Sequence, residues 1–225
     1  MEHDYKDRPS GSIHEGSEAD TAIEPVSAIY PYQFTPQQLM FLCQVVSDTA
    51  NVSGNIAEIG CAHGYTTLFL NRYIDGLRCA PKTYFAIDTF SGFAPDDVEF
   101  EVRVRYKARE MYDAFRDNSV DAFRASMVRA SAKRVTAIQA DVNHFDLRTL
   151  GEVAFAIVDV DLYRPVSKAL PELYESVTPG GVIVVDDCNP TNFYWDGAYE
   201  AYQKFVKSIN RRPEIVHGKL GVIRM

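Results

Sequence analysis

Two short segments of the chain each end an apolar run with a pair of carboxylates. Asp159 and Asp161 close the run in VDVDLY, and Asp186 and Asp187 close the run in VVDDC. Since both runs have the character of buried parallel strands, their carboxyl ends meet at one edge of a sheet. Clustered carboxylates repel one another, and a bound divalent cation relieves that repulsion. Oxygen ligands without nearby His or Cys pairs favour a hard ion, so the sequence predicts Mg²⁺, or Mn²⁺ in its place.

Aspartates at strand ends also have other common roles in α/β proteins. Such a residue often caps the helix that follows, or binds a substrate directly without a metal. Here an adjacent pair ends one strand and two more acids end another. This arrangement favours the metal site over the two alternatives.

A second group of residues suited to binding a ligand begins near position 60. The first apolar run ends in EIGCAHG, and Gly60 and Gly64 let a ligand approach the backbone at a strand-to-helix turn. This spacing lacks the full GxGxxG pattern, and alone it is as often purely structural. Asp88 ends the second run, where an acid accepts hydrogen bonds from ribose hydroxyls. Asp141 ends the third, where it either faces an adenine amino group or caps a helix.

The elements that position these residues follow from the periodicity of the apolar side chains. Five continuous apolar runs indicate parallel strands covered on both faces, and helical patterns alternate with them. The segment EIVHGKLGVIRM predicts a closing hairpin. The predicted fold is therefore α/β, with a doubly wound, mostly parallel sheet. The predicted strands are 55–60, 83–88, 134–139, 153–159 and 180–186, and the predicted helices include Thr66–Tyr73, Val102–Phe115, Val120–Arg129 and Ala198–Ile209.

Two prolines give further local predictions. Thr35, Pro36 and Gln38 have the spacing of a capping box with a first-turn proline, so a helix is expected to begin there. The segment Val166–Val177 also has a helical pattern, but Pro171 lies in its interior. A proline there removes a backbone hydrogen bond and clashes with the preceding turn, so we expect a kink or a break.

Composition limits the number of domains and the class of partner. The 225 residues suffice for one α/β domain; residues 1–22, rich in charge, Gly and Ser, are expected to form a flexible tail before a single domain at 23–225. A net charge of −8 argues against a nucleic-acid partner. The four cysteines are too widely spaced for a CxxC metal site or a disulfide scaffold. No long apolar run or basic-then-apolar leader is visible, so a cytoplasmic protein with no membrane partner is expected.

The segment EIGCAHG resembles the first motif of class I S-adenosylmethionine (SAM) dependent methyltransferases, in which an acidic and an apolar residue precede a Gly-rich turn. The likeness implies a seven-stranded Rossmann-like sheet that ends in an antiparallel strand pair. It implies that Gly60 and Gly64 flank the methionine part of SAM, that Asp88 holds its ribose and that Asp141 lies near its adenine. The implied cofactor-binding residues are Glu58, Gly60, Cys61, Gly64, Tyr65, Thr66, Asp88, Ser91 and Asp141.

The stretch from Asp159 to Asp187 is similar to the macrocin-type, or TylF-like, O-methyltransferases, in which DGDLY precedes a TPGG-type turn and a terminal Asp pair. The segment AIDTFSGF also resembles that family's segment after the second strand. The resemblance implies that Asp161 is the general base and, by analogy, that the protein forms a homodimer. The implied metal ligands are Asp159, Asp186 and Asp187.

The implied reaction moves a methyl group from SAM to a hydroxyl of a small molecule. An alcohol is a poor nucleophile at neutral pH, and coordination to a metal lowers its pKa. Asp161 then takes the released proton while the metal and SAM hold the oxygen and the methyl group in line. The expected acceptor is a sugar or a sugar-bearing secondary metabolite with two neighbouring hydroxyls.

Other functions remain open from the sequence. A catechol-type O-methyltransferase would act on a phenol, but that family commonly has a lysine base where this chain has Asp161, Leu162 and Tyr163. A non-catalytic SAM-binding module would keep EIGCAHG and use the acids only as caps. A nicotinamide-dependent dehydrogenase fits less well because the dinucleotide glycine pattern is incomplete.

Several residues near the predicted site have two interpretations. His63 and His144 are rival bases or local hydrogen-bonding residues. Val160 stands where the TylF-like family usually has glycine, and Cys188 stands where an aromatic residue is common.

Two aromatic-rich segments are candidates for the walls of the site. Phe193, Tyr194 and Trp195 either wall a substrate pocket or pack under the last helix. The region Phe93 to Phe115 is longer and more charged than a tight crossover requires, and is a candidate lid over the active site.

Overall fold

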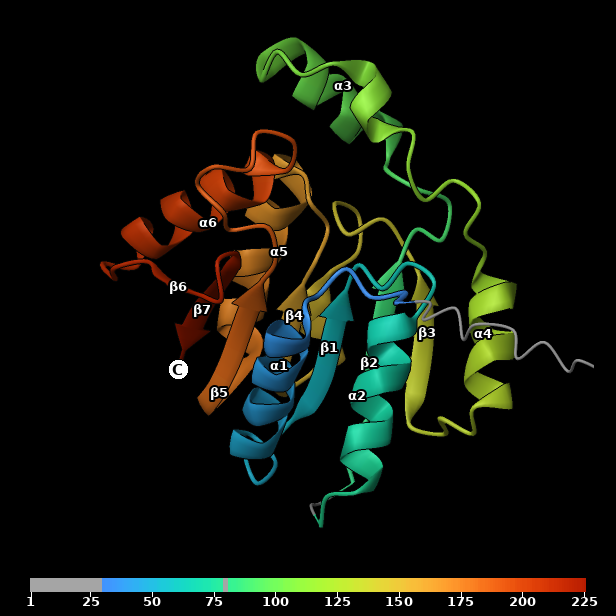
Figure 1. Ribbon diagram of the computed structural model, residues 1–225. Helices are drawn as coiled ribbons and strands as arrows, with labels where there is room; N and C mark the ends of the chain where they lie inside the picture. Colours follow the sequence, from blue (N-terminus) through green and yellow to red (C-terminus); the bar gives the residue numbers. More distant parts are fainter. Residues whose placement is uncertain (1–29, 79–80) are drawn as a thin grey trace, which may run out of the picture. The chain divides into compact units, whose positions relative to one another are not determined.

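A single mixed sheet forms the centre of the structure (Figure 1). The computed structural model describes residues 30–78 and 81–225, so the predicted tail at 1–22 lies outside the described residues. The strands in the described part are β1 (Asn55–Ile59), β2 (Tyr84–Asp88), β3 (Val135–Gln139), β4 (Val153–Val158), β5 (Val177–Val185), β6 (Glu214–Val216) and β7 (Leu220–Arg224). Their order is β3-β2-β1-β4-β5-β7-β6; the first five run parallel, and β7 pairs antiparallel with β5 and β6. The predicted parallel strands and closing hairpin are confirmed.

Helices cover both faces of this sheet. They are α1 (Pro36–Asp48), α2 (Tyr65–Asp75), α3 (Pro95–Val104), α4 (Val120–Arg129), α5 (Tyr163–Ser176) and α6 (Asp196–Ser208). α1 and α2 pack on one face and α5 and α6 on the other, and in Figure 1 the first pair lies in front of the sheet with α5 behind it. α3 stands beyond the carboxyl ends of the strands. The doubly wound, Rossmann-like α/β fold is confirmed.

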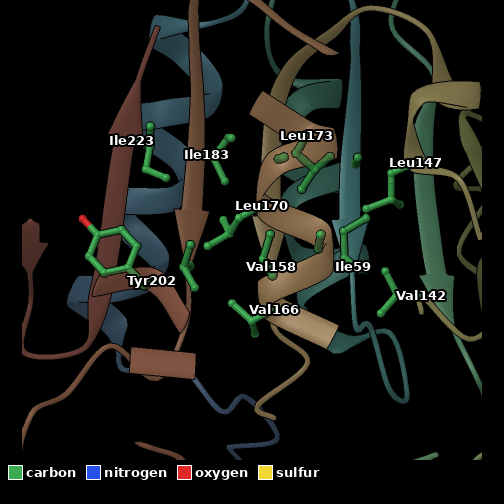
Figure 2. Packing of buried hydrophobic residues seen from close by; sticks show 14 of the residues in the cluster. Ile59, Val142, Leu147, Val158, Val166, Leu170, Leu173, Ile183, Tyr202 and Ile223 are labelled. Atoms are coloured by element: carbon green, nitrogen blue, oxygen red, sulfur yellow. The ribbon is translucent and has the colours of Figure 1, made fainter. Parts of the chain in front are cut away.

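The apolar face of α5 packs tightly on the sheet. Val166, Leu170 and Leu173 recur at helical spacing and point onto Val158 and Ile183 of the sheet (Figure 2). All five side chains are fully buried. Burying one such side chain contributes about 1.5–3 kcal/mol, so this layer fixes the carboxyl ends of β4 and β5 in place.

The start of α1 follows the predicted capping box. The Thr35 N–H donates to Oε1 of Gln38 at 2.8 Å, and the Gln38 N–H donates back to the Thr35 hydroxyl at 3.3 Å. Pro36 occupies the first turn, where its missing N–H costs nothing. The side-chain amide of Gln38 also donates to the carbonyl of His217 at 2.9 Å, so this helix start also supports the hairpin turn between β6 and β7.

Three predictions about local structure are wrong. The helix expected at Val102–Phe115 ends at Val104, because Tyr106 and Phe115 adopt left-handed backbone angles and the chain turns back toward α6. α5 continues across Pro171, so of the expected kink or break the break is wrong. β3 is only partly covered, because it is the edge strand and its side chains are partly exposed.

Candidate active site

A pocket of about 490 Å³ opens at the carboxyl ends of the parallel strands. It is lined by the turn after β1, the end of β2, and the segments that follow β3, β4 and β5. Of the predicted site residues, all but Gly64 and Ser91 line it. The topology therefore brings the predicted cofactor turn and the predicted acid pairs to one cavity.

The turn after β1 has a backbone that a side chain would disrupt. Gly60 has φ of 84°, and a Cβ added there would lie 1.8 Å from the carbonyl oxygen of Asp159. Its N–H donates to the carbonyl of Ile87 at 2.8 Å. A residue other than glycine would push β1 away from β4, so glycine is required for the close approach of the two strand ends.

Asp88 organises this turn. One carboxylate oxygen accepts the N–H groups of Cys61 and Ala62, both at 2.9 Å, and the other accepts the N–H of Phe90 at 2.7 Å. The carboxylate lines the pocket, as predicted for a ribose-binding residue. It therefore has a structural role beside the predicted one, because it fixes two peptide groups of the turn.

Glu58 lies beneath the turn with its carboxylate in the interior. The residue is 2% exposed and accepts hydrogen bonds from the hydroxyls of Thr67 at 2.5 Å and Tyr84 at 2.8 Å. Burial raises the pKa of Glu58 to about 7, although the two hydrogen bonds act in the opposite direction. This carboxyl is thus held at a fixed position by two donors.

Gly64 and Ser91 lie outside the pocket. Gly64, with φ of 82°, starts α2, and a Cβ there would lie 2.6 Å from the ring of Phe123 in α4. It serves the packing of α2 against α4. Ser91 is exposed, and its N–H donates to the hydroxyl of Thr89 at 3.3 Å.

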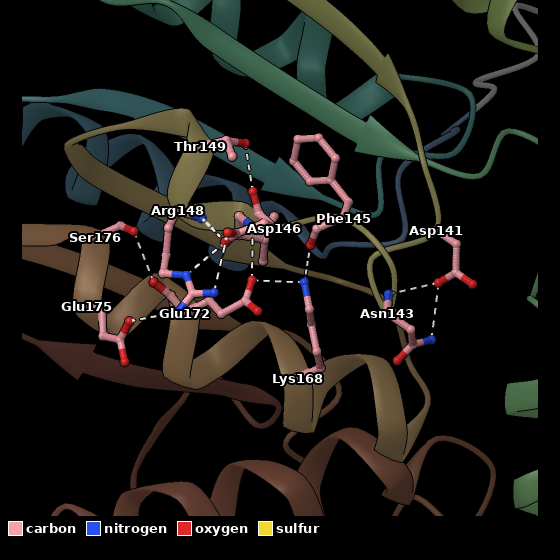
Figure 3. Close-up of polar contacts among 11 residues, drawn as sticks. Asp141, Asn143, Phe145, Asp146, Arg148, Thr149, Lys168, Glu172, Glu175 and Ser176 are labelled. Carbon is pink, nitrogen blue, oxygen red and sulfur yellow. Dashed lines mark hydrogen bonds and ion pairs between the residues drawn. The ribbon is translucent and has the colours of Figure 1, made fainter.

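Asp141 lines the pocket and also holds its own loop (Figure 3). One carboxylate oxygen accepts from the backbone N–H and the side-chain amide of Asn143, at 2.9 and 3.1 Å. The other lies 3.0 Å from Nδ1 of His144. His144 is exposed and does not line the pocket, which favours its interpretation as a local hydrogen-bonding residue over that of a base.

The four strand-end aspartates face one another across the pocket. The N–H of Asp159 donates to the carbonyl of Ile59 at 2.7 Å, and the N–H of Asp186 donates to the carbonyl of Val158 at 2.9 Å. These bonds extend the sheet ladder past the strands. Asp161 and Asp187 both adopt left-handed backbone angles, with φ of 58° and 54°. Such angles are uncommon for residues other than glycine.

The electrostatics of this cluster are unfavourable without a cation. Burial, and then the charges of Asp186 and Asp161, raise the pKa of Asp159 well above its ordinary value. Burial, and then the charge of Asp187, do the same for Asp161. Burial raises the pKa of Asp186 to about 6, and its Oδ1 is buried without a hydrogen-bond partner in the described part of the chain. The cluster therefore favours the binding of a positive charge.

Lys219, which the sequence analysis did not single out, supplies part of that charge. Its ammonium lies 2.6 Å from Oδ2 of Asp186 and 3.7 Å from Oδ1 of Asp187. Burial lowers the pKa of Lys219, but the charges of Asp186 and Asp159 outweigh it and raise the pKa. Asp186 is therefore already engaged in an ion pair.

The metal prediction is not confirmed. Within residues 30–78 and 81–225, no three Asp, Glu, His or Cys side chains are arranged to hold a metal ion. The donor chemistry nevertheless fits a hard divalent cation, since the cluster offers carboxylate oxygens and Oδ1 of Asp186 has no partner among the residues that the structure describes. In this arrangement the ammonium of Lys219, and not a metal ion, lies against Oδ2 of Asp186.

The family profile for macrocin O-methyltransferases (TylF) matches residues 37–215. The chain belongs to the macrocin O-methyltransferase family. It is a SAM-dependent O-methyltransferase, as the resemblance predicted. A comparison with curated protein sequences returned no match.

Solved structures of O-methyltransferases share the fold. The calicheamicin methyltransferase CalS11 is similar with a TM-score of 0.66 and 18% identity, over 84% of this chain and 78% of CalS11. CalS11 is a TDP-rhamnose 3'-O-methyltransferase. NovP gives a TM-score of 0.65 and 18% identity, over 84% of this chain and 79% of NovP. An O-methyltransferase from Bacillus cereus, solved in complex with SAH, gives 0.54 and 18%, over 86% and 81%.

An aromatic wall lines the pocket of this O-methyltransferase opposite the sheet. Phe93 lies between Trp195 and Phe115, with ring centroids 5.7 and 5.8 Å apart. All three line the pocket, which agrees with one of the two interpretations of Trp195. Phe193 and Tyr194 are exposed and do not line it, which fits neither of the two interpretations given for them.

The segment after β2 contributes a second residue that was missed. Asp97 of α3 lines the pocket, is 3% exposed, and accepts a hydrogen bond from the Asn143 amide at 2.6 Å. Its Oδ1 has no hydrogen-bond partner among the described residues and lies 3.6 Å from Nε of Arg164. Burial raises the pKa of Asp97 to about 6. Its sequence context, APDDVEF, resembles an ordinary acidic helix start and gave no signal.

Of the remaining residues with two interpretations, two line the pocket and one lies in the core. His63 lines the pocket, and its Nε2 lies 3.7 Å from the exposed Asp117. Val160 also lines the pocket. Cys188 is fully buried and packs against Gly221 of β7, so this departure from the family pattern lies in the core.

The helices that the structure describes give no sign of a membrane span. Within residues 30–78 and 81–225, no helix is long and apolar enough to cross a bilayer. Cys43, Cys61 and Cys188 are buried free thiols, and Cys79 lies outside the described residues.

Proposed function

We propose that this enzyme is a metal-dependent O-methyltransferase that transfers the methyl group of SAM to a hydroxyl of a sugar or a sugar-bearing small molecule. The observation that carries the proposal is the single pocket of about 490 Å³ that both the glycine turn and the strand-end aspartates line. A methyl donor in the turn and a hydroxyl at the acid cluster would lie within one cavity. Positioning of this kind is a large part of catalysis in group transfer.

The chain's own residues define the two halves of the reaction. SAM, when bound, supplies an electrophilic methyl group, and a divalent ion, when bound, would lower the pKa of an acceptor hydroxyl. Asp159, Asp186 and Asp187 would hold the ion. Asp88 and the turn that it organises would orient the cofactor. Asp161, half-buried at the pocket wall, would accept the hydroxyl proton.

The environment of Asp161 suits the role of a general base. Burial and the neighbouring Asp187 raise the pKa of Asp161, which makes its carboxylate a stronger proton acceptor. The sequence Asp161, Leu162, Tyr163 offers no lysine in its place. The proton of the acceptor hydroxyl would therefore be transferred to the carboxylate of Asp161.

Two observations support a sugar acceptor. CalS11, which shares the fold, acts on TDP-rhamnose. The aromatic wall of Phe93, Phe115 and Trp195 lines the same pocket as the carboxylate cluster. A sugar has the matching combination of C–H faces and neighbouring hydroxyls. The region 93–115, which contributes Phe93, Asp97 and Phe115 to the pocket, stays a candidate lid.

The test is a methylation assay with a defined acceptor panel. Purified protein and SAM are incubated with nucleotide sugars, glycosylated natural products and catechols, with Mg²⁺ or with EDTA, and products are identified by mass spectrometry. We expect methylation of a sugar hydroxyl that EDTA abolishes and Mg²⁺ restores. Methylation of catechols alone, or turnover indifferent to EDTA, would contradict the acceptor class or the metal dependence, respectively.

A substitution at the proposed base checks the mechanism. Asp161→Asn should lower kcat by about 10²-fold or more, because Asn cannot accept a proton. Asp121→Asn, which alters a carboxylate that is 90% exposed on α4, is the matched control and should leave kcat unchanged. Equal kcat values for the two variants would remove Asp161 from the mechanism.

A further inference from the structure

Lys219 is held beside the acid cluster by contacts from several parts of the fold. It lies in the turn between β6 and β7, and its backbone carbonyl accepts the N–H of Cys188 at 2.7 Å. The turn is held from the other side by the Gln38 amide, which donates to the carbonyl of His217. The ring of Phe34 lies 5.0 Å from the ammonium. The Lys219 side chain is only 19% exposed, so its charge is directed into the pocket by three separate elements.

The pocket holds many acids and one strong base. Among the described residues that line it, Lys219 is the only lysine or arginine. The acids that line it are Glu58, Asp88, Asp97, Asp141, Asp159, Asp161, Asp186 and Asp187. Lys219 contacts Asp186 and Asp187, two of the three residues that would hold a metal.

We propose that Lys219 is a built-in counter-cation that competes with the divalent metal for Asp186 and Asp187 and thereby sets the metal affinity of the enzyme. This inference rests on the proposed metal-dependent function. Oδ1 of Asp186 accepts no hydrogen bond from the described residues, whereas Oδ2 accepts one from the ammonium of Lys219. An incoming ion must therefore share Asp186 with Lys219 or displace it. Both routes weaken binding, through like-charge repulsion in the first and a broken ion pair in the second.

The arrangement also explains how the cluster persists in the metal-free protein. A buried carboxylate without a counter-charge costs several kcal/mol. Here the buried Asp186 and Asp187 meet the half-buried Asp159 and Asp161. The ammonium offsets part of that cost at Asp186 and Asp187. Lys219 thus offsets the charge of these acids when no ion is bound, and it competes with an ion that binds.

The experiment measures Mn²⁺ affinity by calorimetry on the full-length, SAM-free protein. Lys219→Met should lower the Kd for Mn²⁺ by about tenfold or more, the usual size of the coupling between two interactions that share a site. Lys219→Gln removes the charge but keeps an N–H for Asp186, and should shift the Kd in the same direction. Lys219→Arg keeps the charge and should leave the Kd near the wild-type value.

A matched control comes from a second lysine with a similar environment. Lys168 of α5 donates to the carbonyl of Phe145 and pairs with Glu172 at 2.8 Å, outside the pocket (Figure 3). Lys168→Met removes a partly buried charge of the same kind without touching the acid cluster. Its Kd for Mn²⁺ should match that of the wild type.

Thermal unfolding gives a second readout. In EDTA, Lys219→Met should melt below the wild type, and Mn²⁺ should raise its melting temperature more than it raises that of the wild type. If Lys219→Met does not fold without metal, Lys219→Gln provides the same comparison.

The outcomes separate this inference from the proposed function. A wild type that binds Mn²⁺ and needs it for turnover, with an unchanged or higher Kd in Lys219→Met and Lys219→Gln, overturns the inference alone. If neither the wild type nor any variant binds Mn²⁺, the inference fails, and turnover indifferent to EDTA then also removes metal dependence from the proposed function.

Discussion

The carboxylates in the two halves of the active-site edge have opposite environments. The first half is the turn after β1 with the end of β2, and the second half is formed by the ends of β4 and β5. At the turn after β1, Glu58 and Asp88 each accept at least two hydrogen bonds from neighbouring hydroxyls or backbone N–H groups. At the ends of β4 and β5, Asp159 and Asp161 mainly face other carboxylates, and a single lysine offsets the charge. The first half is complete as a protein structure, whereas the second has an unmet demand for positive charge.

This difference assigns different tasks to the two halves. A carboxylate that is fixed by hydrogen bonds gives a rigid surface, which suits the binding of a cofactor in one orientation. A cluster of mutually repelling carboxylates stores unfavourable energy that a cation releases when it binds. Substitution of Gly60 or Asp88 in the first half should therefore destabilise the protein, and neutralisation of Asp159 in the second should stabilise it.

The largest effect is expected at the junction of the halves, where β1 meets β4. Gly60→Ala should lower the free energy of unfolding by roughly 3–5 kcal/mol, because its Cβ would lie 1.8 Å from the Asp159 carbonyl oxygen. Gly218→Ala is the matched control, since Gly218 has a similar φ of 82° but open space around the added Cβ. It should cost about 1–2 kcal/mol, from the backbone conformation alone. Urea denaturation measures both, and equal losses would show that the strand contact is not tight.

The next effect concerns the pH dependence of stability. Folding raises the pKa of Glu58 from its ordinary value of 4.5 to about 7, so the folded protein holds this proton more tightly than the unfolded chain. Stability should therefore fall as the pH rises from about 4.5 to about 7, by roughly 3 kcal/mol from this group. Glu58→Gln should lack this part of the decline. Unfolding free energies of both proteins at pH 5 and pH 8 provide the measurement, and parallel curves would contradict the prediction.

A smaller loss is expected when the turn loses its organising charge. Asp88→Asn keeps the shape of the side chain but gives up the charge that the N–H groups of Cys61 and Ala62 bind. The loss of charge-assisted hydrogen bonds should lower the free energy of unfolding by about 2 kcal/mol and weaken SAM binding in parallel. Calorimetric titration with SAM and urea denaturation test the two consequences. A stable variant with unchanged SAM affinity would show that Asp88 is dispensable in this half.

The sequence predicted the acid half and the glycine turn for a topological reason. Parallel strands that alternate with helices place every carboxyl end at one edge, so Asp88, Asp159 and Asp186 converge whatever the details of packing. Lys219 and Asp97 do not follow from that rule. They reach the pocket from a hairpin turn and from a helix beyond the sheet, and nothing local marks them in the sequence.

The errors have related physical causes. Helical periodicity at 102–115 could not reveal that Arg105 turns the chain to pair with Glu101 and Asp196, both at 2.7 Å. Asp196 belongs to a helix about ninety residues further along the chain, so the end of α3 depends on a contact that no local window contains. Ser91 was assigned to the site by the family resemblance, but Phe90 before it adopts a left-handed backbone angle, and Ser91 does not line the pocket.

The smallest predicted effect has the opposite sign and tests the comparison most directly. Within the described residues the Asp159 carboxylate accepts no hydrogen bond, and its pKa is raised by burial and by Asp186 and Asp161. A carboxyl whose pKa is raised by folding costs stability at every pH above its unfolded value. Asp159→Asn should therefore stabilise the metal-free protein by about 1 kcal/mol at pH 7.5, although it removes a proposed metal ligand.

Urea denaturation in EDTA provides the measurement, with Asp88→Asn as the paired variant. The two substitutions are chemically identical, lie at the carboxyl ends of the strands on either side of β1 and should change stability in opposite directions. In Mn²⁺ the gain of Asp159→Asn should shrink or reverse, because the wild type would then recover the binding free energy of the ion. A loss of stability for both variants in EDTA would mean that the acids after β4 are as well satisfied as those after β1 and β2.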